Sequence, residues 1–155
     1  MKISDFLSKD LIIADLRETE KCKVLEELVE FVAQKIAGID AGELLKVLLD
    51  REQMGSTGIG DGIAIPHGKL KDLKQIIAVF GKSSRGVAFD AMDGRPVYLL
   101  FLLIAPENSA GVHLKALARL SRLLKRNGFR QKLMNLSDAE QLYQVIIEED
   151  EHGGT

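Results

Sequence analysis

The sequence predicts a single α/β domain in which helices flank a mixed central β-sheet. The chain has 155 residues, a length that suits one domain. Apolar residues recur with helical spacing towards both ends, and short apolar runs typical of strands fill the middle. No internal repeat or interdomain linker divides the chain. We expect the domain to cover residues 1–150, with an acidic, glycine-rich and frayed tail at 151–155.

The first third of the chain predicts one short strand and two helices. The strand is expected at residues 11–16, an apolar run. A helix is expected at 19–37, where apolar side chains recur every four positions: Val24, Leu28, Val32 and Ile36. Gly38 is a suitable stop for this helix. Asp40 is a good N-cap residue for a second helix, which runs to about residue 54.

The middle of the chain begins with four glycines within residues 55–62, too many for a helix or a central strand. Apolar runs then predict strands at 63–65, 76–80, 87–89 and 97–104. A turn-rich segment, 81–86, is expected to separate the second and third of them. The last run is apolar enough to be covered on both faces. Helical segments are expected to end the chain at 109–126, 129–136 and 138–149.

Composition excludes several classes of protein. The net charge of −2 and the pI near 5.9 argue against a basic, nucleic-acid-coating protein. The longest uncharged apolar run, 97–105, is too short to cross a bilayer, and the acidic N-terminus does not resemble a signal peptide. A single cysteine cannot form an internal disulfide, which suits a reducing compartment. We expect a cytoplasmic protein that neither inserts into membranes nor binds nucleic acid.

The glycine cluster is one candidate for chemistry, because glycine-rich loops bring backbone N–H groups close to phosphate. Its spacing does not match the nucleotide-binding motifs. A dinucleotide fingerprint needs glycine where the chain has Ile63 or Ile65, and a P-loop needs Ser or Thr where it has Leu70. The alternative is that these glycines only permit tight turns. We therefore expect no nucleotide site.

His67 is the second candidate. It lies between Pro66 and Gly68, just beyond the end of a predicted strand, where a loop can expose it to a partner. For an isolated histidine the alternative is a structural role with its ring nitrogens hydrogen-bonded. The combination of glycine loop, strand end and histidine favours a functional role.

His113 is the third candidate. It shares a helix face with Leu117, Leu120 and Leu124, so one interpretation is a core histidine. It also lies in the first helical turn, where the helix dipole disfavours imidazolium. A neutral imidazole there can donate one N–H to a phosphate.

Other chemistries have little support in the sequence. The histidines lack cysteine or carboxylate neighbours at zinc spacing, and no G-x-S-x-G elbow is present. Cys22, between two lysines early in a helix, is best interpreted as an inert thiol. We expect neither a metal nor a cofactor.

Residues 52–68 carry a specific motif. An acidic residue, Glu52, precedes residues 60–68, which read Gly-Asp-Gly-Ile-Ala-Ile-Pro-His-Gly. This stretch, including the distance at which Glu52 stands, resembles the phosphohistidine signature of fructose/mannitol-type enzyme IIA domains of the bacterial phosphoenolpyruvate:sugar phosphotransferase system. The similarity extends upstream through 51–60 and resumes at 89–94, 106–108 and 113–118. The Gly-Ser-Thr-Gly-Ile-Gly run and the stand-alone length are most similar to the nitrogen-regulatory branch.

The resemblance implies that His67 accepts a phosphoryl group from an HPr-like phosphocarrier and that Arg51 and His113 line the same site. It leaves two functions open. One is a regulatory protein whose phosphorylation state selects its partners, such as a transporter or a sensor kinase. The other is a sugar-transport component that relays phosphate from His67 to the cysteine of a IIB domain. The only cysteine of the chain lies in a predicted helix, so the chain contains no IIB module, and this favours regulation.

Overall fold

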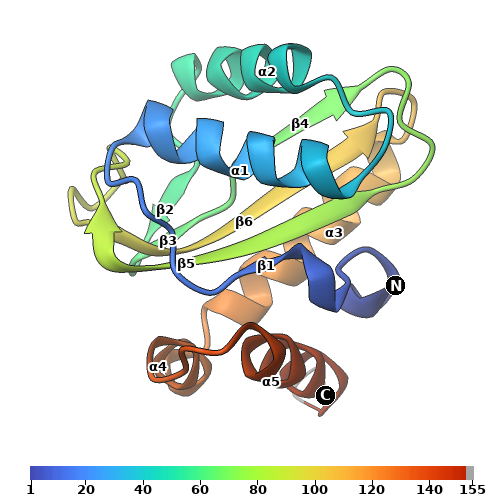
Figure 1. The fold of residues 1–155 in the computed structure, drawn as a ribbon. Helices are drawn as coiled ribbons and strands as arrows, with labels where there is room; N and C mark the ends of the chain where they lie inside the picture. The colour runs from blue at the N-terminus through green and yellow to red at the C-terminus, as the bar shows by residue number, and fades with distance from the viewer. Residues whose placement is uncertain (153–155) are drawn as a thin grey trace.

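A six-stranded mixed sheet lies between two groups of helices in the computed structural model, which describes residues 1–152 (Figure 1). The helices α1 and α2 lie on one side of the sheet in this view, and α3, α4 and α5 lie on the other. The strand order is β1-β5-β6-β3-β2, with β4 also paired to β6. The predicted fold class is therefore confirmed.

A short strand and two helices come first, the other strands follow one another in the middle of the chain, and three helices end it, in the order that the sequence pattern indicates. The helices are α1 (Lys21–Lys35), α2 (Ala41–Gln53), α3 (Ala110–Leu124), α4 (Asn127–Met134) and α5 (Ala139–His152). Two 3₁₀ turns, η1 (Ile3–Asp5) and η2 (Lys9–Leu11), precede them. The strands are β1 (Ile12–Ile13), β2 (Gly58–Gly60), β3 (Ile63–Ala64), β4 (His67–Leu70), β5 (Ile77–Val87) and β6 (Val97–Pro106).

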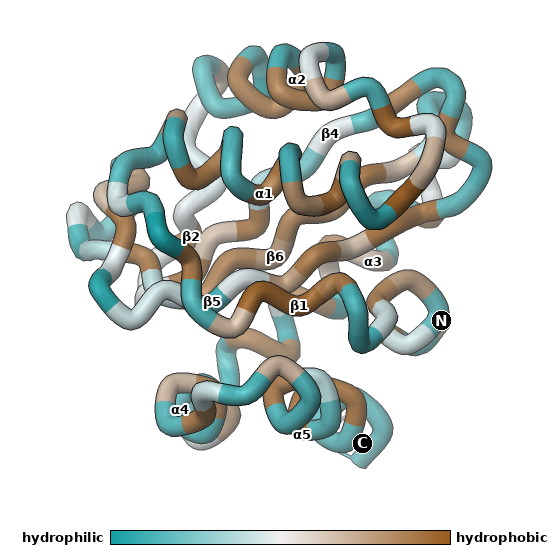
Figure 2. The backbone as a smooth tube through the Cα atoms, viewed as in Figure 1, coloured by the Kyte–Doolittle hydropathy of each residue, from teal (hydrophilic) through white to brown (hydrophobic). Residues whose placement is uncertain are grey.

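Strand β6 forms the centre of the sheet. It pairs antiparallel with β5 and parallel with both β3 and β4, which follow one another along its length: Ile63 is opposite Leu99, and His67 is opposite Leu103. Every residue of β6 except Tyr98 is buried. The prediction that this run is covered on both faces is confirmed, and Figure 2 shows hydrophobic residues along β5 and β6 beneath the helices.

The predicted turn at 81–86 is wrong, because these residues continue β5 beside β6. Gly81 is not a turn glycine: a Cβ atom there would lie 2.9 Å from the Leu16 side chain, so the glycine permits close packing. Gly86, with φ +90°, lies where the β5–β6 register shifts, between Lys82 and Val87. The turn-like composition therefore marks a bulged strand rather than a loop.

Smaller differences occur at other element ends. The predicted strand at 11–16 forms sheet pairs only at Ile12–Ile13. The glycine cluster contains an edge strand, β2, that the sequence did not predict. Helix α5 continues through Glu151 and His152, the first residues of the expected tail, and residues 153–155 lie outside the described part of the chain.

A buried carboxylate joins the two ends of the described chain. Asp150 on α5 accepts a hydrogen bond from the backbone N–H of Ile3 at 2.8 Å and pairs with Arg119 on α3 at 2.6 Å. Asp150 is only 5% exposed, so both contacts are shielded from water. No helix within residues 1–152 has the length and apolar character needed to span a bilayer.

Candidate phosphoryl-transfer site

His67 is the first residue of β4, three residues after the end of β3. Its Nδ1 atom lies 2.8 Å from the carbonyl oxygen of Ile65, which fixes the ring against its own backbone. The preceding Pro66 is held in the sheet, because its carbonyl accepts the N–H of Leu103 at 2.9 Å. The expected position of His67 at a strand end is correct, although a further strand rather than a loop follows it.

Gly68 brings α2 close to this strand. A Cβ atom at Gly68 would lie 2.5 Å from a methyl carbon of Val47, so only glycine permits this approach. The close packing places the C-terminal turn of α2, with Arg51, next to His67. Arg51 donates from Nε towards Nε2 of His67 at 3.4 Å and from Nη1 to the carbonyl of Gly55 at 2.9 Å. The guanidinium is thus held beside the outer nitrogen of the ring.

His113 approaches His67 from helix α3. It lies in the first turn of this helix, where its backbone N–H donates to the carbonyl oxygen of Ser109 at 3.0 Å. Its ring centroid is 5.4 Å from that of His67, with the planes inclined by 69°. His113 is buried, and its Nε2 atom has no hydrogen-bond partner among the described residues. The three residues that the sequence singled out therefore lie together in space.

Both imidazoles favour the neutral form. Burial, together with the nearby charges of His67 and Lys69, lowers the pKa of His113 to about 4. Burial also lowers the pKa of His67 below its ordinary value of 6.5; the Ile65 carbonyl opposes this shift, and the Arg51 charge adds to it. Two neutral histidines at neutral pH leave one ring nitrogen free to attack and another free to donate.

A buried network lies behind the site; the motif included Glu52, but its contacts were not predicted. The carboxylate of Glu52 accepts the backbone N–H of Thr57 at 3.0 Å, contacts its hydroxyl, and pairs with Lys21 at 2.7 Å. The carbonyl of Thr57 in turn accepts the N–H of Ile65 at 3.0 Å. Since Ile65 holds the His67 ring, these contacts connect helix α1 to the orientation of His67.

Lys69 was also missed. It lies two residues after His67 on β4, and alternate residues of a strand share a face. Its charge contributes to the lowered pKa of His113, which indicates that it lies near the site. The signal for Lys69 was strand alternation, which the predicted loop at this position concealed.

The glycine cluster builds a sharp reversal between β2 and β3. Gly60, Asp61 and Gly62 have consecutive positive φ values of 98°, 57° and 78°. This geometry agrees with the tight-turn interpretation of the glycines. Within residues 1–152, no group of three or more His, Cys, Asp or Glu side chains is arranged to hold a metal ion, and Cys22 is exposed.

Comparison with known proteins identifies the class to which this fold and site belong. The family described as "Phosphoenolpyruvate-dependent sugar phosphotransferase system, EIIA 2" matches residues 5–149. Because this match covers most of the chain, the chain belongs to this family of enzyme IIA domains.

Individual relatives fall in both the regulatory and the sugar-transport groups. A nitrogen regulatory protein of Bradyrhizobium diazoefficiens is 41% identical over 94% of this chain and 95% of its own length. The fructose-specific EIIABC component of Bacillus subtilis is 35% identical over 97% of this chain, which spans only 24% of that longer protein. The crystal structure of the nitrogen regulatory protein IIA-Ntr from Neisseria meningitidis superposes with a TM-score of 0.86 at 34% identity, covering 93% of this chain and 98% of that one.

Proposed function

We propose that this protein is a phosphoryl-accepting regulatory component of the bacterial phosphotransferase system that acts in the cytoplasm. His67 takes a phosphoryl group from the phosphohistidine of an HPr-like phosphocarrier. The phosphorylation state then changes which target protein the chain binds, such as a transporter or a sensor kinase. The similarity to stand-alone nitrogen regulatory proteins along nearly their whole length supports the regulatory role.

The observation that carries this proposal is the state of the two ring nitrogens of His67. Nδ1 lies 2.8 Å from a carbonyl oxygen, which can only accept a hydrogen bond, so Nδ1 carries the proton. Nε2 then bears the lone pair and is the nucleophile. In the transfer, the P–N bond to the donor histidine breaks as the P–N bond to Nε2 forms, and the proton stays on Nδ1, hydrogen-bonded to the Ile65 carbonyl.

Charge stabilisation would come from the residues around Nε2. Phosphoryl transfer depends on alignment and on stabilising the charge of the phosphoryl oxygens more than on acid–base steps. Arg51, 3.4 Å from Nε2, can turn its N–H groups to those oxygens. The buried Nε2 of His113 has no hydrogen-bond partner within residues 1–152, and in the Nε2–H tautomer it donates to the same group. No metal is needed in this scheme.

Exposed apolar side chains close in sequence to the site residues support a protein partner. Met54 is 84% exposed and follows Arg51 at the end of α2, and Leu114 is 67% exposed and follows His113 on α3. Large apolar side chains left in water next to a reactive group are typical of a protein contact surface. A phosphocarrier that docks there would bring its phosphohistidine to Nε2 of His67.

The test is phosphorylation of the full chain with phosphoenolpyruvate, enzyme I and an HPr-like carrier. We expect one phosphoryl group per chain with the acid-labile, base-stable behaviour of phosphohistidine. His67→Ala should abolish it, and His152→Ala, which removes a histidine from the exposed end of α5, should leave it unchanged. Incorporation into His67→Ala would overturn the assignment.

The sugar-transport role is the second candidate, favoured by the 35% identity to the fructose-specific component. In that role, His67 passes its phosphoryl group to the cysteine of a IIB domain. Mixing the phosphorylated chain with candidate IIB domains separates the two functions. Rapid transfer to a IIB cysteine supports transport, whereas a target that binds the unphosphorylated chain about a hundredfold more tightly, a difference of about 2.7 kcal/mol, supports regulation.

A further inference from the structure

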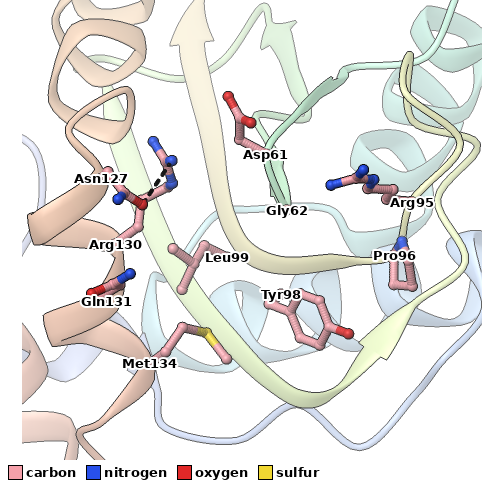
Figure 3. A pocket seen from close by; sticks show the side chains of 10 residues that line it. All are labelled: Asp61, Gly62, Arg95, Pro96, Tyr98, Leu99, Asn127, Arg130, Gln131 and Met134. Atoms are coloured by element: carbon pink, nitrogen blue, oxygen red, sulfur yellow. Dashed lines mark hydrogen bonds between the residues drawn. The ribbon is translucent and has the colours of Figure 1, made fainter.

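A hollow of about 400 Å³ lies between the start of β6 and helix α4, away from the residues of the His67 site. Figure 3 shows Leu99 in its centre, with Tyr98 and Met134 along one side. The volume is within the range of small-molecule sites, which are commonly apolar with a few polar groups at the walls. Nothing in the proposed transfer reaction uses this hollow.

Two guanidinium groups face the hollow from opposite sides (Figure 3). Arg130 on α4 is half-buried and held in place: Nη1 donates to the carbonyl of Leu124 at 2.8 Å and Nη2 to the Asn127 side chain at 3.3 Å. Arg95 comes from the loop before β6, and its side chain makes no hydrogen bond or ion pair within residues 1–152. The Arg95 charge lies near enough to Asp93 to help lower the pKa of that exposed carboxyl, but no ion pair within residues 1–152 occupies the guanidinium, which leaves its N–H groups available to a ligand.

The charge of the lining favours an anion. Among residues 1–152, Asp61 is the one acidic residue that lines the hollow against the two arginines, and Figure 3 shows its carboxylate directed away from Leu99 and Tyr98. The nearby Asp93 carboxylate does not line the hollow and accepts the backbone N–H groups of Asp61 and Arg95. Guanidinium groups bind carboxylates and phosphates through paired N–H donors. The apolar centre can contact an organic body, which inorganic phosphate lacks.

We propose that this hollow binds a small organic anion. Its carboxylate or phosphate group is held by Arg95 and Arg130, and its body lies against Leu99 and Tyr98. Binding there does not depend on phosphorylation of His67, so this proposal is tested independently of the proposed function.

The hollow also borders the glycine turn that leads to the His67 strand. The carbonyl of Gly62, a lining residue, accepts the N–H of Tyr98 at 2.8 Å and of Leu99 at 3.0 Å. A ligand seated on Leu99 would perturb these hydrogen bonds. The amide signals of Tyr98 and Leu99 are therefore local reporters of occupancy.

The test is a titration of the full, isotope-labelled chain followed by amide chemical shifts. The probes are phenyl phosphate, benzoate, inorganic phosphate and benzyl alcohol. We expect saturable shifts at Tyr98, Leu99 and Gly62 with phenyl phosphate or benzoate, and the tighter of the two identifies the anionic group. No saturable shift with either organic anion, or equal binding of benzyl alcohol, would overturn the proposal; equal binding of inorganic phosphate would overturn the role of the organic body.

Variants locate the site. Arg95→Gln removes an exposed side chain that makes no hydrogen bond or ion pair with residues 1–152, so it should weaken binding roughly tenfold while leaving the unfolding temperature unchanged. Arg122→Gln is the matched control, since Arg122 is an exposed arginine on α3 outside the hollow, and it should bind as the unaltered chain does. Equal affinities of Arg95→Gln and the unaltered chain would reject this site.

Discussion

The Nδ1 atom of His67 lies 2.8 Å from the carbonyl oxygen of Ile65, two residues earlier in the chain. Because a carbonyl only accepts, this contact selects one tautomer and leaves Nε2 facing Arg51 and His113. The contact depends on a strand path that runs from β3 through Pro66 into β4. The reactivity of His67 therefore depends on the backbone path that holds its ring.

His113→Ala should fold and slow phosphorylation of His67 by roughly 10²–10³-fold, the range seen when one oxyanion donor is lost. The reason is that Nε2 of His113 is buried near the His67 ring and has no hydrogen-bond partner in the described part of the chain. His113→Gln, which retains an N–H donor, should recover part of the rate. Rates are measured with the phosphorylated carrier in single-turnover conditions. A normal rate combined with a lowered unfolding temperature would indicate a core histidine instead.

The free energy of unfolding of the unphosphorylated chain should fall as the pH is lowered from 6.5 to about 4. The pKa of His113 is about 4 in the folded chain and near 6.5 when unfolded, so the unfolded state binds more protons in this window. The stabilisation is complete above pH 6.5 and is lost as pH falls towards 4, with a magnitude of about 3 kcal/mol. Urea unfolding across this range measures it. His113→Asn should show a smaller slope, and an unchanged slope would contradict the shift.

Glu52→Gln should destabilise the chain by about 2 kcal/mol and also slow phosphorylation. The change weakens the contacts to Thr57 and Lys21 that stand behind Ile65 and the His67 ring. The ring nitrogen chemical shifts of His67 should move towards a mixture of tautomers, which a purely structural effect would not cause. Glu26→Gln is the control, since Glu26 pairs with Lys23 at 3.9 Å on the exposed face of α1. If the tautomer and rate stay unchanged, Glu52 has no positioning role.

Asp150→Asn should lower the free energy of unfolding by about 3 kcal/mol, because it breaks a buried pair and leaves Arg119 without its carboxylate. Amide hydrogen exchange at Ile3 should accelerate, since this N–H donates to Asp150. Asp50→Asn offers a comparison at an exposed ion pair with Lys46, where the change should stay within about 0.5 kcal/mol. Similar losses in the two variants would mean that burial adds nothing to the Asp150 contacts.

Local sequence pattern determined a large part of the molecule. Helical periodicity predicted the helices to within a few residues, and Asp40 caps α2 as expected, accepting the N–H of Glu43 at 3.1 Å. The continuous apolar run at 97–104 predicted a strand covered on both faces. The motif at residues 52–68 indicated the family, which the match over residues 5–149 confirms. These signals were readable because each depends on residues close together in the chain.

Only the tertiary structure decided the extent of β5, the presence of β4 and the grouping of the site. Residues 81–86 read as a turn, yet they belong to a bulged strand because β6 pairs with Gly81 and Lys82 before the bulge and with Val87 after it, and Leu16 packs on Gly81. Pairing with β6 likewise makes His67–Leu70 a strand. Contacts between distant segments outweigh the local preferences of such short runs. The same long-range packing, of α2 on Gly68, places Arg51 beside His67. No local sequence pattern predicts this contact, because it depends on how the helix packs on the strand.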